Sequence, residues 1–233
     1  MATSKGRTIR GLAPEDRRRQ RRQELLDSAL ELFAANGYAA TSIEQICQHA
    51  MVGNKAFYEE FATKEQLFIE LYDTIGGRLL PVVFEAFNAA EPGDGWLTTI
   101  VAAYIRAAMA DPRVARVLFL TSAGVSEAVD LHRRTAHRLF AAFFADVYRA
   151  GLVSDGNVKG NPHGNAIALG VTGGMGEVVV DFLIDPGERD VDDLVADLVA
   201  FVNTVVVGLT TPVAPAPDRP PPAKGPRPRK PKA

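Results

Sequence analysis

Apolar side chains recur every three or four positions along most of the chain, which is the period of a helix that buries one face. The first such stretch begins near Arg17 and ends at Asn36-Gly37, a pair typical of a helix C-terminus. No stretch shows the strict alternation of apolar and polar residues expected of a half-buried strand. The sequence therefore predicts an all-α fold.

Two short helices are expected directly after this first one. Thr41 and Glu44 have the spacing of a capping box, which predicts the start of a short helix between them. The period then breaks at Met51-Val52-Gly53, and a third helix is expected over 54–61.

Longer helices are expected over the rest of the chain. Thr63 and Gln66 have the spacing of a second capping box, and the helix that they open is expected to end near Gly76-Gly77. Beyond that point the apolar period predicts helices at about 78–90, 96–110, 113–121, 125–150, 164–184 and 190–209.

The composition is that of a globular protein. Hydrophobic residues make up 47% and charged residues 23% of the 233 residues, which is enough to bury one large core or two smaller ones. Cys47 is the single cysteine, so no intramolecular disulfide can form and nothing indicates an oxidising compartment. Since no signal-like segment and no run of about 18 apolar residues is present, we expect a cytoplasmic protein outside membranes.

Charge is segregated along the chain, although the formal net charge is only −2. Residues 1–23 hold eight Lys and Arg against two acidic residues, and residues 212–233 hold six against one. We expect residues 1–16, which lack a helical period, to form a flexible basic arm, and residues 211–233, which include nine prolines, to form a disordered tail. Basic ends suit contact with nucleic acid, and they equally suit solvated tails.

A long helix followed by two short helices across a three-residue turn is the arrangement of a helix-turn-helix. Apolar residues of the three helices can bury together and leave the polar face of the third free to enter a major groove about 12 Å wide. The run from Arg22 to Leu67 contains Ala29, Leu32-Phe33, Gly37-Tyr38, Thr41-Ser42-Ile43, Ile46, Ala50, Val52, Tyr58, Phe61 and Lys64-Glu65. In these positions it resembles the DNA-binding domain of the TetR family of repressors.

The resemblance implies contacts with phosphates, base edges and the DNA backbone. These would come, in that order, from Thr41 and Ser42, from Asn54, Lys55 and Ala56, and from Tyr58 and Lys64. Residue chemistry agrees, because Asn can read adenine by paired hydrogen bonds, Lys can donate to guanine, and hydroxyls and amines at helix N-termini suit phosphate oxygens.

The chain departs from the family pattern at three positions of this motif. Met51 stands where a turn glycine is usual, Gly53 where a capping serine is usual, and Phe57 where leucine is common. In addition, Glu59 and Glu60 end the third helix, where phosphates would repel a carboxylate unless it accepts from cytosine or pairs with an arginine. The sequence leaves both options open.

By the same resemblance, residues 17–63 would form the DNA-binding domain and residues 64–210 a helical domain for effector binding and dimerisation. The helices between 78 and 150 combine aromatic side chains with few polar ones, which suits a mostly apolar cavity for a small apolar or aromatic effector. Candidate lining residues are Trp96, Tyr104, Arg106, Met109, Phe119, His137, Phe140 and Phe144.

The last two helices are the expected interface of a homodimer. Four glycines between residues 170 and 176 permit close backbone approach, and the apolar stripes of both helices suit a four-helix interface. The stripes consist of Ile167, Val171, Met175, Val178, Phe182, Leu194, Leu198, Phe201 and Val205. A dimer would set two recognition helices on half-sites about 34 to 36 Å apart.

Other classes of protein are weaker readings of the sequence. The glycine-rich stretch 170–176 lacks the βαβ surroundings of a dinucleotide site, and the histidines lack metal-ligand spacing, so we expect no enzyme, cofactor or metal. We therefore expect a repressor that binds double-stranded operator DNA and a small-molecule effector. The alternatives are a DNA-coating protein without sequence choice and, less favoured, a helical enzyme.

Overall fold

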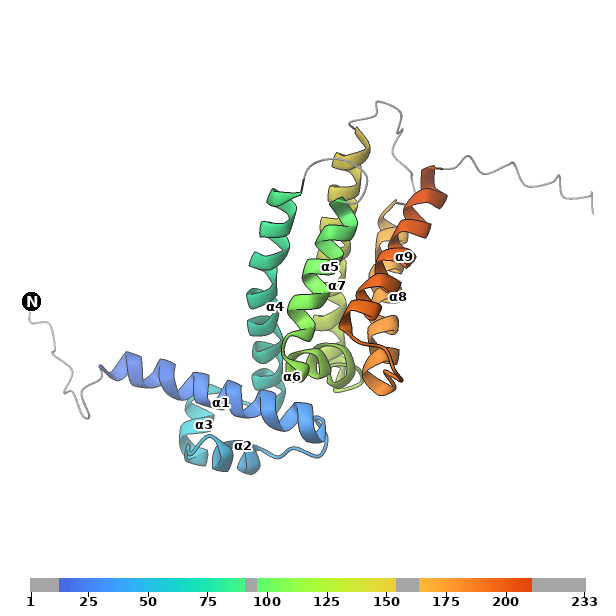
Figure 1. Cartoon of the computed structure of the whole chain (residues 1–233). Coiled ribbons are helices and arrows are strands. Elements are labelled where there is room, and N and C mark those ends of the chain that lie inside the picture. Colours follow the sequence, from blue (N-terminus) through green and yellow to red (C-terminus); the bar gives the residue numbers. More distant parts are fainter. Residues whose placement is uncertain (1–12, 91–95, 154–163, 211–233) are drawn as a thin grey trace, which may run out of the picture.

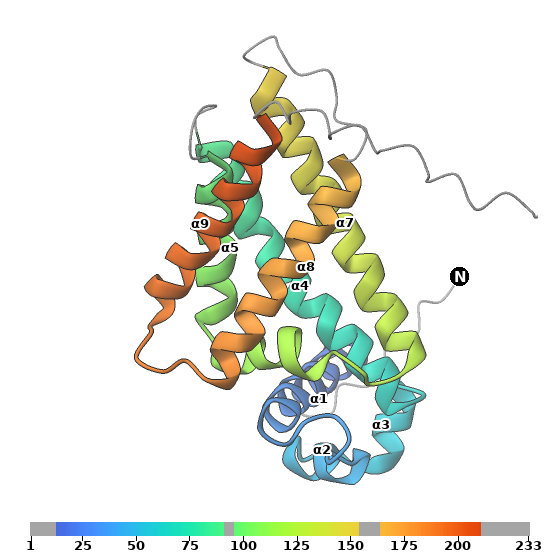
Figure 2. The ribbon, with the colours of Figure 1, turned by 90° about the vertical axis from the view of Figure 1, so that its right-hand side faces the viewer.

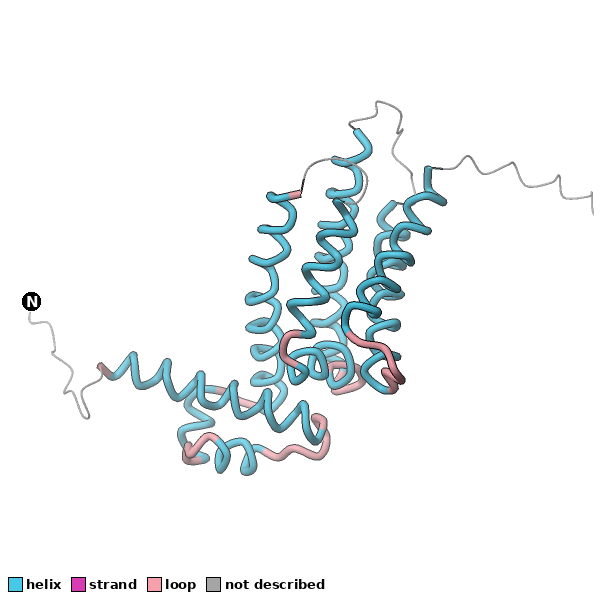
Figure 3. Tube along the Cα trace, in the orientation of Figure 1, coloured by secondary structure: helices cyan, strands magenta, loops and turns pink. Residues whose placement is uncertain are grey.

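The structure, a computed structural model, describes residues 13–90, 96–153 and 164–210, and these residues form only helices and loops (Figure 3). The helices are α1 (Pro14–Asn36), α2 (Ile43–His49), α3 (Asn54–Glu60), α4 (Lys64–Ala89), α5 (Trp96–Met109), α6 (Pro112–Ala115), the π-helical η1 (Arg116–Thr121), α7 (Glu127–Val153), α8 (Gly164–Ile184) and α9 (Val191–Thr210). Helices α1–α3 lie beneath the upright helices α4, α5, α7, α8 and α9 (Figures 1 and 2). The predicted all-α fold is confirmed.

The N-terminal helices share one core with the start of α4. Ala29 and Phe33 of α1, Ile46 of α2 and Phe57 of α3 are fully buried, as their helical spacing predicted. Phe33 also packs edge-on against Phe68 of α4, with 5.3 Å between the ring centroids. Because this core spans α1 to α4, the short helices are held by tertiary packing rather than by their own helix propensity.

Helix α1 ends, and helix α2 begins, at residues suited to those positions. Gly37, with a φ of 77°, ends α1, a conformation that costs a residue without Cβ little. Ser42 caps α2, because its Oγ accepts from the Gln45 N–H while the Gln45 side chain accepts from the Ser42 N–H. The expected box of Thr41 with Glu44 is therefore wrong by one residue, since the Thr41 hydroxyl turns inward and donates to the Gly37 carbonyl at 2.8 Å.

Helix α1 begins at Pro14, three residues before the expected boundary at Arg17. Proline needs no N–H partner in the first turn of a helix, and Glu15 and Asp16 follow it where carboxylates favour the helix dipole. The arginine-rich stretch is consequently helical, and only residues 1–12 of the expected arm lie outside the described residues.

Helix α4 continues through Gly76-Gly77, where it was expected to end. Ile75, Leu79 and Val83 are all buried and follow one another at intervals of four, so the apolar stripe runs unbroken past the glycines. Glycine lowers helix propensity by only about 1 kcal/mol, which the burial of these three side chains outweighs. The separate helix expected over 78–90 is thus the second half of α4.

The larger domain has a core of its own between α4, α5, α8 and α9. Met175 and Phe182 of α8 and Leu194 and Leu198 of α9 belong to it, and the most exposed of the four, Phe182, is only 7% exposed. Their expected place in a dimer interface is wrong, because each already packs against helices of its own subunit. The Gly174 backbone lies close to α9, since a Cβ there would meet Phe201 at 2.9 Å.

The other face of α8 is open, and its exposed positions are mainly small or apolar but include Glu177 and Asp181. Its outward positions include Leu169, 43% exposed, and Ile184, 71% exposed. By length and composition the segment Asn165–Ile184 could cross a membrane, with a mean hydropathy of 1.7 and 22% of its most apolar window buried. One such helix is weak evidence for a membrane span, and an apolar face of this kind equally suits a protein partner.

Segment η1 joins the two domains. Arg116 donates to the Ala34 carbonyl at 3.1 Å, and Thr121 donates to the Phe33 carbonyl at 3.3 Å. These carbonyls belong to the last turn of α1, and that of Phe33 also accepts from the Gly37 N–H at 3.0 Å. The C-terminal end of α1 is therefore bonded to the larger domain.

Candidate DNA-binding surface and ligand pocket

Helix α3 presents a polar face to solvent. Asn54 and Lys55 are exposed in its first turn, and Tyr58 is 59% exposed one turn later, whereas Phe57 on the opposite face is fully buried. Ala56 is half-buried. The arrangement leaves an amide, an ammonium and a phenol free on one side of a helix held rigidly by its other side.

The turn before α3 differs from a glycine turn in its side chain but not in its backbone. Met51 adopts a φ of 54°, the left-handed region that favours glycine, and its side chain is 91% exposed. Gly53 caps α3 without a side-chain hydrogen bond. The departures from the family pattern at these two positions thus leave α2 and α3 in the helix-turn-helix arrangement.

Two residues expected to contact DNA are occupied within the protein. Thr41 is 1% exposed, and its N–H donates to the Tyr38 carbonyl while its hydroxyl donates to Gly37. Lys64 donates from Nζ to the carbonyls of Tyr38 and Thr41 at 2.8 and 2.6 Å, and it lies 4.1 Å from the centre of the Tyr38 ring. Burial lowers the pKa of Lys64. Both residues therefore fix the loop between α1 and α2, so we no longer assign them the predicted contacts with phosphates and the DNA backbone.

Glu60, at the end of α3, pairs with arginines of α1. Its side chain is fully buried and accepts from Arg18 at 3.0 Å and from Arg21 at 2.5 and 3.2 Å. Burial alone would raise the pKa of Glu60, but the hydrogen bonds and charges of Arg21 and Arg18 hold it below its usual value. The alternative left open by the sequence is decided in favour of arginine, so this carboxylate does not face DNA.

Arg22 strengthens the same junction from the other side. It donates to the Glu60 backbone carbonyl at 2.9 Å, binds the Glu70 carboxylate of α4 and lies over the Phe61 ring at 4.3 Å. We call Glu60, Arg18, Arg21, Arg22 and Glu70 the arginine clamp. It ties α1, α3 and α4 together and fixes the angle at which α3 is presented.

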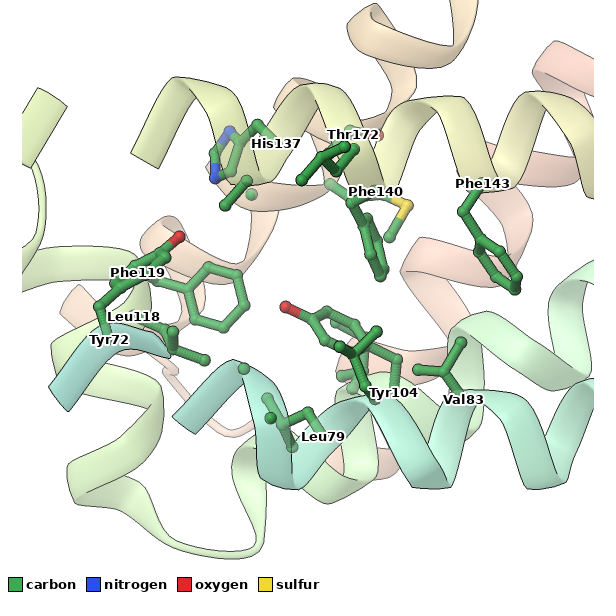
Figure 4. A pocket seen from close by; sticks show the side chains of 18 of the residues that line it. Tyr72, Leu79, Val83, Tyr104, Leu118, Phe119, His137, Phe140, Phe143 and Thr172 are labelled. Carbon is green, nitrogen blue, oxygen red and sulfur yellow. The ribbon is translucent and has the colours of Figure 1, made fainter. Parts of the chain in front are cut away.

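The larger domain encloses a cavity of about 400 Å³ between α4, α5, η1, α7 and α8 (Figure 4). Four of the expected residues line it, namely Tyr104, Phe119, His137 and Phe140. Two do not, because Arg106 pairs with Asp192 on the surface and Met109 packs against the core of the larger domain. The side chains of Trp96 and Phe144 lie outside the described residues.

Helix α4 supplies the wall that the sequence did not reveal. Its lining residues are Tyr72, Asp73, Gly76, Gly77, Leu79, Leu80, Val83 and Phe84, and α8 adds Thr172, Met175 and Gly176. The sequence pattern predicted a helix end at the Gly76-Gly77 pair. Because the apolar stripe continues past the pair, the missing side chains could instead have indicated room for a cavity beside the helix. The cavity has the size and apolar lining of a small-molecule site.

Few polar groups face this cavity. Burial raises the pKa of both Tyr72 and Tyr104, so both phenols stay protonated. Burial and the nearby charge of Arg133 lower the pKa of His137, which favours its neutral form. The helix-turn-helix with its exposed polar helix defines the class as that of DNA-binding proteins, and the same helical chain holds a ligand-sized cavity.

Comparison with known proteins agrees with this class. Residues 25–71 match the family described as "Bacterial regulatory proteins, tetR family". The HTH-type transcriptional regulator TcmR of Streptomyces glaucescens is 43% identical over 49 residues, which cover 21% of this chain and 22% of TcmR. The chain therefore matches only about a fifth of that relative's length, within the DNA-binding region.

Solved structures share the fold of the whole chain at low identity. A TetR-family transcriptional regulator from Syntrophomonas wolfei matches 82% of this chain and 97% of its own, with a TM-score of 0.71 and 20% identity. FadR from Bacillus subtilis in complex with stearoyl-CoA covers 82% of this chain and 99% of its own, with a TM-score of 0.65 and 19% identity. Residues 25–71 therefore match the DNA-binding segment of the TetR family, and the chain shares the fold of solved TetR-family structures.

Proposed function

We propose that the protein is a dimeric repressor that binds a palindromic operator and leaves it when a small, mostly apolar effector fills the cavity. The observation that carries this proposal is the exposed polar face of α3 on a rigid helix-turn-helix, in the same chain as an apolar cavity. A regulator of bacterial genes with these properties would work in the cytoplasm, where its DNA lies.

For the DNA contacts we retain Ser42, Asn54, Lys55, Ala56 and Tyr58. Asn54 and Lys55 stand in the first turn of α3, the part of a recognition helix that reaches base edges. The exposed side of α1 adds arginines, of which Arg19 has a side chain that is 80% exposed. These cations can meet phosphates beside the major groove.

The partner that we propose for the open face of α8 is a second copy of this chain. Binding to a palindrome needs two recognition helices related by a two-fold axis, about 34 to 36 Å apart. The outward residues Leu169 and Ile184 are apolar, and the exposed Gly170 and Gly173 leave room for close helix contact. Of the stripe expected from sequence, Ile167, Val171, Val178, Phe201 and Val205 are half-buried and stay as candidate edge residues.

Effector binding can act on α3 through two of the cavity walls. Phe119 lies on η1, which is bonded to the end of α1, and Tyr72 lies on α4, which directly follows the helix-turn-helix. An effector can bind better to a conformation in which the two recognition helices do not match the half-site spacing. Its difference in affinity between the two conformations then sets how far DNA affinity falls. A coupling of about 1 to 3 kcal/mol would weaken operator binding roughly 5- to 150-fold.

The proposal is tested with DNA from beside the protein's own coding region. We expect protection of an inverted repeat and a preference over random duplex of about 10³ or more at physiological salt. Sedimentation at micromolar concentration should give a dimer. Equal affinity for random duplex would indicate a DNA-coating protein instead, and a monomer that floats with lipid vesicles would assign α8 to a membrane.

A further inference from the structure

The cavity holds no positive charge to receive an anion. No Lys or Arg lines it, and its histidine, His137, favours the neutral form. Its acidic residue, Asp73, is 58% exposed at the rim and accepts from His132 at 2.6 Å. The charge of Arg133 reaches His137 and Tyr72, but Arg133 is not among the lining residues, so a carboxylate or phosphate inside would lose its hydration without direct contact with a counter-ion, which disfavours binding.

Aromatic rings approach the cavity from opposite walls. Tyr104 of α5 and Phe140 of α7 lie with their centroids 4.8 Å apart, and Phe84 of α4 meets Phe143 of α7 edge-on at 5.6 Å. Phe119 of η1 faces the same space, as Figure 4 shows. Rings arranged in this way favour a ring system, which they can contact by offset stacking and by their edges.

One donor in this space lacks a partner. Within the described residues the Tyr104 hydroxyl makes no hydrogen bond, and in Figure 4 its oxygen points into the opening between Phe119 and Phe140. The Thr172 hydroxyl, in contrast, already donates to the Ala168 carbonyl at 2.9 Å. A phenol that stays protonated and unpaired in apolar surroundings favours a ligand that brings an acceptor to it.

We propose that the cavity selects a compact, uncharged aromatic ring system. This ligand carries an acceptor that accepts a hydrogen bond from the Tyr104 hydroxyl. This inference rests on the proposed function, because it names the effector class of the same cavity.

Three matched probes test the ligand class on the full chain by isothermal titration calorimetry. Fluorene has the rings alone, fluorenone adds a carbonyl acceptor, and fluorenone-4-carboxylate adds a negative charge. We expect fluorenone to bind about 5-fold tighter than fluorene. The carboxylate should bind at least about 10-fold more weakly than fluorenone.

Two variants test the place of binding. Tyr104→Phe should remove the preference for fluorenone over fluorene, whereas Tyr38→Phe, at a residue outside the cavity lining, should keep the preference. Gly76→Leu should abolish binding of both neutral probes, because a Cβ at this lining position meets no atom within 4 Å and the larger side chain fills the cavity. Leucine has a higher helix propensity than glycine, so α4 should remain folded, which the melting temperature checks.

Three results would overturn the proposal: tight binding of the carboxylate, an unchanged preference in Tyr104→Phe, or no binding of any probe at about 1 mM. Operator release is measured separately by fluorescence anisotropy of labelled DNA. If fluorenone binds as expected but leaves the DNA complex intact, the ligand class stands and the proposed repressor mechanism fails.

Discussion

Replacement of Glu60 tests whether the arginine clamp holds the recognition helix. In Glu60→Gln one carboxylate oxygen becomes an amide NH₂, which cannot accept from arginine. Glu60 accepts three hydrogen bonds from Arg18 and Arg21, and bonds to charged groups contribute about 1.5 to 3 kcal/mol each when fully buried. The side chains of Arg18 and Arg21 are 64% and 30% exposed, so water replaces part of the loss. We expect about 1 to 2 kcal/mol lower stability for Glu60→Gln and about 2 to 3 for Glu60→Ala.

The assay is urea unfolding of the full chain, followed by circular dichroism at one fixed protein concentration, because the unfolding of the proposed dimer would depend on concentration. Glu59→Gln is the matched control, since Glu59 is 51% exposed and 3.5 Å from Arg21. It should change stability by less than about 0.5 kcal/mol. Equal unfolding midpoints for the two variants would refute the clamp.

The pH dependence of the same difference gives an independent check. The pKa of Glu60 is lowered in the folded chain, so its contribution is fully present above its unfolded pKa of about 4.3 and is lost as the pH falls through the folded value. The stability gap between the wild type and Glu60→Gln should therefore be constant above about pH 5 and shrink below it. A gap that widens as the pH falls would contradict this assignment.

Three further predictions concern other contacts. Lys55→Met should lower operator affinity and reduce the slope of log affinity against log salt by up to about 1. Lys64→Met should instead lower stability and leave that slope unchanged, because Lys64 bonds carbonyls of its own chain. Equal salt slopes for the two variants would contradict this assignment. Gly174→Ala should be about 1 to 2 kcal/mol less stable in urea than Gly176→Ala, because both gain helix propensity and only the first meets Phe201; equal midpoints would argue against that close approach. Cys47 is 2% exposed, and burial and then Glu44 raise its pKa, so a thiol reagent should label it only as the N-terminal core unfolds; rapid labelling of native protein would show an open core.

Helix positions could be predicted because the apolar period survives wherever a helix packs on one side. The same pattern placed Phe57 inside and Asn54 and Lys55 outside, which is the essential feature of the candidate DNA surface. It was harder to decide between two neighbouring residues that suit the same role. Thr41 and Ser42 are both good caps in isolation, and only the packing of the loop onto α1 decides which of them turns inward.

The remaining features depend on contacts between distant segments. Glu60 and Arg18 are 42 positions apart, so no local pattern reveals their pairing. The cavity wall on α4 needs the placement of α7 opposite it. On α8 apolar residues occur on both faces, so periodicity could not tell that Met175 and Phe182 pack within their own chain while Leu169 and Ile184 face outward with Glu177 and Asp181.

The π-helical winding of η1 would become α-helical if one residue were deleted from it. A π-helical turn contains about one residue more than an α-helical turn. Loss of one residue between Arg116 and Thr121 would leave a regular α-helix continuous with α6, and it would rotate everything after the deletion by about 100°. Phe119 could then no longer face the cavity while Arg116 and Thr121 hold the end of α1. Homologues that lack this residue are therefore expected to link the N-terminal helices to the larger domain through different side chains.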